Sequence, residues 1–314
     1  MKTLRNIAAL KEVTRPVSLA IGFFDGVHLG HASVIRQARD VATDGGGETW
    51  VLTFDPHPRV VLQPETAPPL LSPSGRKLHL LDDQGVDGCV LMTFNRDLAS
   101  QSPADFLDLL RGSIPTLTHV AVGQNFHFGH ERTGSPALLS ELLGAHGIEV
   151  RVAEPVSWDG TPISSTRIRH AIHGGDLAAA AAMLGRHYTV SGVVEHGRQV
   201  GREIGFPTAN VKHEQQVLPP HGVYAATAST AGSDHPAVLN LGCRPSIEAS
   251  QETLLEVHLL DFGGDLYGQE LHVTFREYLR PERGFPDGKA LAAQISKDVE
   301  CARRVLLAQS RNSP

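Results

Sequence analysis

Cysteine is scarce in this sequence, and its pattern excludes several classes of protein. Only Cys89, Cys243 and Cys301 occur among the 314 residues, and their spacing fits neither a metal cluster nor a disulfide framework. Free thiols are typical of a reducing compartment. The first residues lack the long apolar core of a signal peptide, and no apolar run is long enough to span a bilayer. We therefore expect a cytoplasmic protein without a membrane partner, whose oligomeric state stays open.

An excess of basic residues is also missing. The 28 lysines and arginines are outnumbered by 34 aspartates and glutamates, which gives a net charge of −6. Dedicated nucleic-acid binders usually carry a basic surface, so no nucleic-acid partner is expected. A nucleotide substrate is still possible, because its phosphates need only a few local donors. The length allows two domains of ordinary size, with ample apolar material for a core.

The two commonest phosphate-binding loops are absent as well. There is no GxxxxGK[ST] sequence and no GxGxxG sequence after a predicted strand. The run of glycines at 45–47 precedes a predicted strand, which indicates a plain loop. Phosphate chemistry in this chain would therefore have to use a histidine-bearing turn and Arg167.

That histidine turn spans residues 22–31, GFFDGVHLGH, between a predicted strand at 17–21 and a predicted helix at 33–41. A helix N-terminus presents unpaired N–H groups and a partial positive charge, so it receives phosphate readily. The turn's glycines allow the backbone to approach a ligand closely. The imidazoles of His28 and His31 can donate hydrogen bonds to an oxyanion. The alternative is that one histidine caps the helix while the other packs or faces water.

The rest of the first half alternates strands and helices. Predicted strands lie at 49–54, 89–94, 120–122 and 148–152, and predicted helices at 74–81 and 103–110. Such alternation indicates a parallel sheet covered on both faces, whose ligands bind beyond the carboxyl ends of the strands. His57, Asn125, Phe128 and the short predicted helix that opens at 164–167 all fall at such ends.

The pattern changes near residues 184–187. Beyond this point, strand-like runs at 223–228, 237–241, 253–260 and 270–279 are separated by glycine and proline, which indicates a small barrel. A final helix at about 289–307 has one apolar stripe for docking on that barrel, formed by Ala292, Ile295, Val299 and Val305. We therefore expect two domains, 1–186 and 187–314.

The barrel half opens with a segment that combines three glycines with hard oxygen ligands. Gly197, Gly201 and Gly205 form a loop whose backbone amides could cradle phosphates. Thr208 and Asn210 point the same way if the segment is extended, and their oxygens suit Mg²⁺ beside phosphates. The alternative is an ordinary hairpin.

Glu256 lies within an apolar strand, where a carboxylate is costly unless it has a partner or a task. Accepting a hydroxyl proton during phosphoryl transfer is one such task. The alternative is a glutamate that faces solvent.

These residues resemble the bacterial bifunctional riboflavin kinase/FMN adenylyltransferase family, also called FAD synthetase. The resemblance covers essentially the whole chain in the family's order. Its motifs are 22–31, 53–58 (TFDPHP), 123–129 (GQNFHFG), 163–169 (ISSTRIR), 201–210 (GREIGFPTAN), 241–246 (LGCRPS), 256–258 (EVH), 261–262 (DF) and 266–268 (LYG).

The resemblance implies an α/β, Rossmann-like nucleotidylyltransferase domain with a parallel sheet, followed by an all-β riboflavin kinase-like barrel with a terminal helix. The barrel would transfer the γ-phosphate of ATP to riboflavin, giving FMN. The first domain would transfer AMP from a second ATP to FMN, giving FAD and diphosphate. The implied partners are riboflavin, FMN, FAD and ATP, with Mg²⁺ as cofactor.

Roles follow from the matching positions. His28 and His31 would stabilise the transferring phosphate, and Glu256 would be the general base of the kinase. ATP would be held in the adenylyltransferase by Gly22, Phe24, Asn125, Ser164 and Arg167. Flavin walls would be Phe54, Pro56, Pro58 and Phe128. In the kinase, Gly201, Arg202 and Gly205 would form the ATP loop, and Thr208 and Asn210 would hold the metal.

Two positions depart from the family's usual pattern. Ser246 stands where relatives usually carry threonine, which keeps the hydroxyl, and Asn125 stands where they often carry aspartate. Other functions stay open at this point. One is an adenylyltransferase that acts on another phosphorylated acceptor, with an accessory barrel. Another is a flavin-binding or storage module without turnover.

Overall fold

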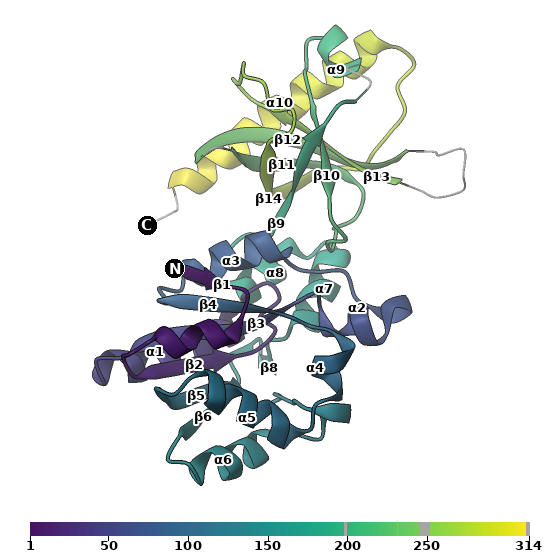
Figure 1. The fold of residues 1–314 in the computed structure, drawn as a ribbon. Helices are drawn as coiled ribbons and strands as arrows, with labels where there is room; N and C mark the ends of the chain where they lie inside the picture. The colour runs from purple at the N-terminus through teal and green to yellow at the C-terminus, as the bar shows by residue number, and fades with distance from the viewer. Residues whose placement is uncertain (198–199, 231, 245–251, 312–314) are drawn as a thin grey trace. The chain divides into compact units, whose positions relative to one another are not determined.

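The computed structural model describes residues 1–197, 200–230, 232–244 and 252–311. The chain divides into two compact units, of which the first comprises Met1–Leu70 with Ser74–Ser165 and the second Leu71–Pro73 with Thr166–Pro314 (Figure 1). Ser246, named above for its hydroxyl, lies outside the described residues.

The first unit is built on a six-stranded sheet in which every pairing is parallel. The spatial order is β1-β4-β3-β2-β5-β6. The strands are β1 (Lys2–Leu4), β2 (Val17–Ile21), β3 (Glu48–Asp55), β4 (Gly88–Thr93), β5 (Leu117–Gly123) and β6 (Glu149–Ala153). The predicted parallel sheet is confirmed, and β1 adds an edge strand that the sequence pattern did not indicate.

Helices cover this sheet on both faces, as the alternation of strands and helices predicts: α1 (Leu29–Asp44) and α3 (Ser74–Asp82) contribute to one buried cluster, and α5 (Pro103–Ser113) and α6 (Pro136–Gly144) to the other. The unit also contains the short helices α2 (Pro58–Leu62) and α4 (Arg96–Ser100). Shorter elements are the 3₁₀ helices η1 (Ile7–Glu12), η2 (Pro64–Thr66) and η3 (His130–Arg132), and the strand pair β7 (Ser157–Trp158) and β8 (Thr161–Pro162).

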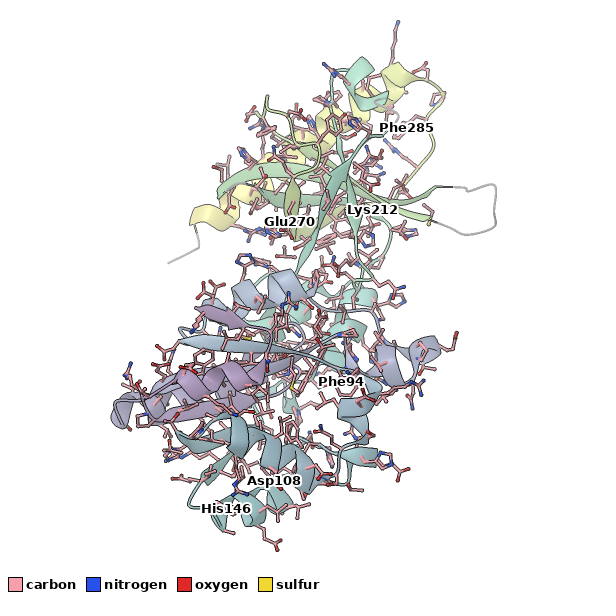
Figure 2. All side chains as sticks on the ribbon, viewed as in Figure 1. Phe94, Asp108, His146, Lys212, Glu270 and Phe285 are labelled. Atoms are coloured by element: carbon pink, nitrogen blue, oxygen red, sulfur yellow. The ribbon has the colours of Figure 1, made fainter. Side chains whose placement is uncertain are left out.

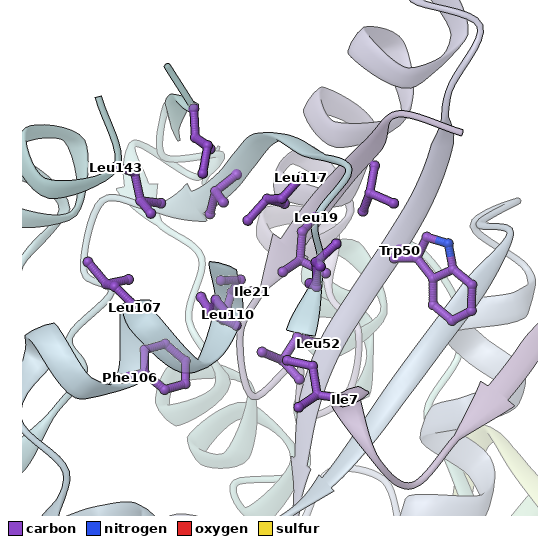
Figure 3. Packing of buried hydrophobic residues seen from close by; sticks show 14 of the residues in the cluster. Ile7, Leu19, Ile21, Trp50, Leu52, Phe106, Leu107, Leu110, Leu117 and Leu143 are labelled. Carbon is purple, nitrogen blue, oxygen red and sulfur yellow. The ribbon is translucent and has the colours of Figure 1, made fainter. Parts of the chain in front are cut away.

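The core lies on both faces of the sheet because successive strand residues point to opposite sides. Leu19 and Ile21 of β2 join the cluster that contains Leu110 of α5 (Figure 3). The intervening Ala20 joins the other cluster, which contains Ile35 of α1. A strand that is buried on both faces has a continuous apolar sequence, and for this reason the strand at 17–21 can be recognised from the sequence.

The second unit contains a closed barrel of antiparallel strands in the order β10-β13-β12-β11-β14-β9. The strands are β9 (Thr189–Glu195), β10 (Ala209–His213), β11 (Gly222–Thr230), β12 (Ser233–Arg244), β13 (Glu252–Leu259) and β14 (Glu270–Arg280). The helices are α7 (Ser165–His173), which begins at the last residue of the first unit, α8 (Leu177–Leu184), α9 (Val200–Glu203) and α10 (Gly288–Arg311). The predicted barrel with a terminal helix is confirmed.

Helix α10 docks on this barrel through part of its predicted apolar stripe. Val299 and Val305 pack, together with the buried Ala302, against a cluster that includes Val223 of β11 and Val238 of β12. The stripe therefore serves the docking that the sequence predicts.

Candidate active sites

The histidine turn leads directly into a helix that starts earlier than the sequence predicts. Helix α1 begins at Leu29 instead of residue 33, and His28 is its N-cap. The Nδ1 atom of His28 accepts a hydrogen bond from the backbone N–H of His31 at 3.3 Å. An accepting Nδ1 leaves the proton of a neutral imidazole on Nε2, so the ring keeps a donor besides its capping role.

The backbone of this turn is held in an uncommon conformation. Phe24 and Val27 have φ values of 54° and 37°, which residues other than glycine rarely adopt. Such residues cost about 1–3 kcal/mol each and persist only where the surroundings hold them. Phe24 is 1% exposed. A Cβ on Gly22 would lie 2.9 Å from the Phe24 ring, so a side chain at Gly22 would displace that ring.

The two histidine rings lie side by side. Their centroids are 3.6 Å apart in a stacked arrangement, and the Phe24 ring meets His31 edge-on at 5.3 Å. The ring of His28 is buried, whereas His31 is half-buried. The stack thus presents two imidazoles at one point, at the N-terminus of a helix of 16 residues, with His28 as its N-cap and His31 in its first turn.

The segment before α7 lies beside this turn. A Cβ on Gly30 would meet the carbonyl oxygen of Ile163 at 3.8 Å, and the Ser165 hydroxyl donates to the Asp25 carbonyl at 3.3 Å. Ser164, which lies between Ile163 and Ser165, is therefore an exposed neighbour of the histidine turn. Arg167 follows along the chain near the start of α7, and its side chain is half-buried.

The turn also marks the place where the strand order reverses. Along the chain, the strands after β2 are added on the β3 side, and β5 is then added on the other side of β2. Ligands of open α/β sheets bind at such a switch point. Asn125 is exposed on the loop that follows β5, and its carbonyl oxygen lies 3.0 Å from Nδ1 of His127. It therefore shares a sheet edge with the histidine turn.

Phe128 occupies a different environment from the one expected for a ligand wall. It is 7% exposed and belongs to the core of the first unit, with its ring centroid 5.7 Å from that of Phe106. Phe126 stacks on it at 5.6 Å and is half-buried. Of these two aromatic residues, Phe126 has the more accessible side chain.

The loop after β3 carries the other predicted flavin walls. Phe54 is half-buried and meets Phe94, labelled in Figure 2, edge-on at 6.0 Å. Pro56 is exposed, and Pro58 is the first residue of α2. The loop adjoins the histidine turn, because the ring of His57 lies 4.2 Å from that of Phe23.

The second unit contains a pocket of about 340 Å³. Of the residues predicted for the kinase site, Gly201, Thr208 and Glu256 line it. The other lining residues are Ile204, Phe206, Val223, Val238, Asn240, His258, Arg280, Glu282, Arg283, Phe285, Leu291, Ile295 and Asp298. Arg202, Gly205 and Asn210 are absent from this lining in the described part of the chain.

The barrel register nevertheless brings Asn210 to Glu256. Asn210 of β10 is the register partner of Glu256 in β13, and Glu256 is in turn the partner of Asn240 in β12. This polar row runs across three adjacent strands. No hydrogen bond or ion pair joins the Glu256 side chain to another described residue. Its half-buried carboxylate at the pocket is therefore available to a ligand.

Two glycines of the segment that opens the barrel half lie close to the side chains of the predicted metal ligands, Thr208 and Asn210. A Cβ on Gly197 would lie 2.1 Å from the amide nitrogen of Asn210, and one on Gly201 would lie 3.3 Å from the Thr208 hydroxyl. Part of the segment forms the short helix α9, where a phosphate-binding loop was expected. The glycines thus permit close approach at Thr208 and Asn210.

Sequence reasoning missed an ion pair at the pocket. Arg280 at the end of β14 meets Asp298 of α10 at 2.7 Å, and their side chains are 17% and 6% exposed. Gln294 donates a further hydrogen bond to Asp298 at 2.8 Å. The guanidinium of Arg280 lies 5.8 Å from the centre of the Phe285 ring, which is labelled in Figure 2. The pair could not be read from the sequence, because it joins elements whose contact depends on the docking of α10.

A doubly wound domain with paired imidazoles at its switch point, followed by a barrel with a carboxylate-bearing pocket, defines a two-domain transferase. Comparison with known proteins agrees with this class. Residues 10–167 match the family model described as FAD synthetase, and residues 184–306 match the model described as riboflavin kinase.

Curated relatives span nearly the same length. A bifunctional riboflavin kinase/FMN adenylyltransferase of Pseudomonas fluorescens is 37% identical over 96% of this chain and 97% of the relative. That of Escherichia coli K12 is 35% identical, again over 96% of this chain and 97% of the relative. The chain belongs to the bifunctional riboflavin kinase/FMN adenylyltransferase family.

A crystal structure described as a macrolide-efflux protein from Streptococcus pneumoniae shares the fold. Its TM-score is 0.84 at 27% identity, over 96% of this chain and 99% of that one. Among the helices of the described residues, none is both long and apolar enough to cross a membrane.

Proposed function

We propose that this chain makes FAD from riboflavin in two steps, one in each domain. The barrel transfers a phosphoryl group from ATP to riboflavin, and the N-terminal domain joins the resulting FMN to AMP from a second ATP. The observation that carries this proposal is the succession, in one chain, of a domain matching FAD synthetase and a domain matching riboflavin kinase.

In the first domain, an oxygen of the FMN phosphate attacks the α-phosphorus of ATP, and diphosphate leaves as the α–β bridging bond breaks. His28 and His31 stand at the N-terminus of α1, where their N–H groups and the helix dipole stabilise the negative charge that develops. Ser164 precedes Ser165, whose hydroxyl donates to the turn, and it holds the triphosphate together with Arg167 of α7. Asn125 approaches ATP from the loop after β5.

The remaining predicted residues of this domain fall into two groups, one that shapes the ATP site and one that contacts the flavin. Gly22 and Phe24 shape the turn that receives ATP, since Phe24 supports the ring of His31. Phe54, Pro56 and Pro58 provide an apolar wall for the flavin. Phe128 supports that wall from within the core, through Phe126.

In the barrel, the terminal hydroxyl of the ribityl chain attacks the γ-phosphorus of ATP, and ADP leaves. Glu256 orients this hydroxyl and accepts its proton, a role that suits a half-buried carboxylate without a partner among the described residues. Gly201, Arg202 and Gly205 form the segment that covers the phosphates. Gly201 lines the pocket, and Gly205 has the positive φ of 87° that allows the segment to turn.

Mg²⁺ fits the donors at this pocket and on the strand beside it. The Thr208 hydroxyl and the Asn210 amide supply hard oxygen atoms, and the described residues contain no group of three or more His, Cys, Asp or Glu side chains that could hold a metal without phosphate. Thr208 and Asn210 would therefore hold the ion together with phosphate oxygens. When bound, it would offset the charge of the transferring phosphoryl group.

The test is incubation of the purified chain with riboflavin, ATP and Mg²⁺, followed by chromatography. We expect FMN to appear first and FAD to follow. FAD formed from supplied FMN without any phosphorylation of riboflavin would assign the barrel an accessory role. Flavin binding without either product would make the chain a binding module.

A further inference from the structure

Lys77 of α3 is buried beside the histidine turn, although lysine side chains are almost never fully buried unless paired. It is 2% exposed. Its ammonium donates to the carbonyl of Phe54 at 2.9 Å, to the hydroxyl of Thr53 at 3.3 Å and to the carbonyl of Phe23 at 3.4 Å. An ammonium has three N–H donors, so each one has an acceptor within the first unit.

These acceptors belong to two different segments. Phe23 lies in the histidine turn after β2, whereas Thr53 and Phe54 lie at the end of β3. The Thr53 hydroxyl also donates to the Phe23 carbonyl at 2.8 Å. Lys77 thus connects the turn that carries the histidines with the end of β3, from which the next loop continues.

The charge of Lys77 is balanced by two carboxylates. Burial lowers its pKa to about 8, and the nearby carboxylates of Asp25 and Asp55 limit that decrease. Asp55 also accepts from the Ser74 hydroxyl at 2.6 Å. On β4, burial raises the pKa of the Cys89 thiol to about 12, so this neighbour stays neutral. Lys77 is therefore mainly protonated at pH 7 and changes its charge within the range of an enzyme assay.

We propose that Lys77 is a positioning residue of the adenylyltransferase site, which holds the histidine turn at a fixed distance from the loop after β3. This inference rests on the proposed function. The turn contains strained residues and has to be held by its surroundings. Without the ammonium, two carbonyls and a hydroxyl would lose a buried donor, and the turn would shift relative to the loop that receives FMN.

The experiment compares Lys77→Met with Lys11→Met in the full chain. Methionine keeps the apolar stem of Lys77 and removes its donors, while Lys11 is an exposed lysine of the same unit. We expect kcat for FAD formation from FMN to fall by about 10–100-fold in Lys77→Met, as for a misplaced reacting group. KM should change little, and riboflavin phosphorylation in the same preparation should match Lys11→Met.

A pH profile separates this role from a merely structural one. In the wild-type chain, kcat for FAD formation should fall as the pH rises through about 8, because the neutral amine has one donor fewer, and this decrease should be absent in Lys77→Met.

A folded Lys77→Met protein within threefold of Lys11→Met in FAD formation would overturn the proposal. If Lys77→Met does not fold, the wild-type profile decides, and kcat that stays level up to pH 9.5 would overturn it. Wild-type protein that makes no FAD from FMN would overturn the proposed function and this role with it.

Discussion

Replacing Glu256 with glutamine should stop riboflavin phosphorylation while leaving the fold intact. The substitution keeps the shape of the side chain and removes its charge. A general base contributes about 10²–10⁴-fold to a rate, equal to about 3–5 kcal/mol. Phe206 and Val238 line the same pocket as Glu256. We therefore expect kcat to fall by about 10²–10⁴-fold.

Stability should be almost unchanged, because the Glu256 side chain makes no hydrogen bond or ion pair with the described residues. We expect the free energy of unfolding to change by less than about 0.5 kcal/mol. The assay follows FMN formed from riboflavin at saturating ATP and Mg²⁺. FAD formation from supplied FMN in the same preparation is the internal control.

The matched control variant is Glu270→Gln, at the start of β14, where the glutamate is exposed and labelled in Figure 2. It should phosphorylate riboflavin at the wild-type rate. Kinase turnover of a folded Glu256→Gln protein within a few-fold of Glu270→Gln would refute the assignment of Glu256 as the base.

Three further predictions concern the other unit and the domain division. His28→Ala should slow FAD formation from FMN, with a loss of about 2–4 kcal/mol of transition-state stabilisation, while riboflavin phosphorylation continues. His28→Asn can still cap α1, so its activity separates capping from catalysis. Equal loss of both activities in folded His28→Ala would count against the assignment of His28 to adenylyl transfer. A fragment that starts at Gly185 should fold by circular dichroism and phosphorylate riboflavin, and an unfolded fragment would refute the boundary predicted at residue 186. The unfolded chain keeps the Lys77 proton up to the ordinary pKa of 10.5, whereas the folded chain releases it near 8, so Lys77 should add about 1 kcal/mol of stability between pH 8 and pH 9. Urea unfolding should show this gain relative to Lys77→Met, and equal pH dependence in the two proteins would contradict it.

Much of the fold is predictable because burial leaves a local signature. The strand at 17–21 is found at its predicted bounds, since every position is buried and apolar or small. Helix α1 extends beyond its predicted start, because His28 caps it in place of the usual serine, threonine, aspartate or asparagine. Strands β1 and β10 are too short for a period of two to stand out from neighbouring residues.

The sites are predictable only where their residues lie close together in the sequence. The pairing of Asn210 with Glu256 and Asn240 depends on barrel register, which no local pattern specifies. Lys77 resembles an ordinary solvent-facing lysine of an amphipathic helix, and only the packing of α3 shows that it is buried. The core position of Phe128 is likewise set by tertiary packing, because Phe126 and Phe128 are equivalent in the sequence.

The central claim, that one chain carries two phosphate-transfer reactions at separate sites, is tested most directly by following label from ATP. Riboflavin is incubated with the full chain, Mg²⁺ and ATP labelled at either the γ- or the α-phosphate, and FMN and FAD are separated. The γ-label should enter FMN and remain in FAD, whereas the α-label should enter FAD alone. With FMN supplied in place of riboflavin, Glu256→Gln should still transfer the α-label into FAD, although it no longer makes FMN efficiently from riboflavin. His28→Ala should make γ-labelled FMN from riboflavin but little FAD. Label from the α-phosphate in FMN, loss of α-transfer to supplied FMN in folded Glu256→Gln, or loss of γ-transfer to riboflavin in folded His28→Ala would contradict the account.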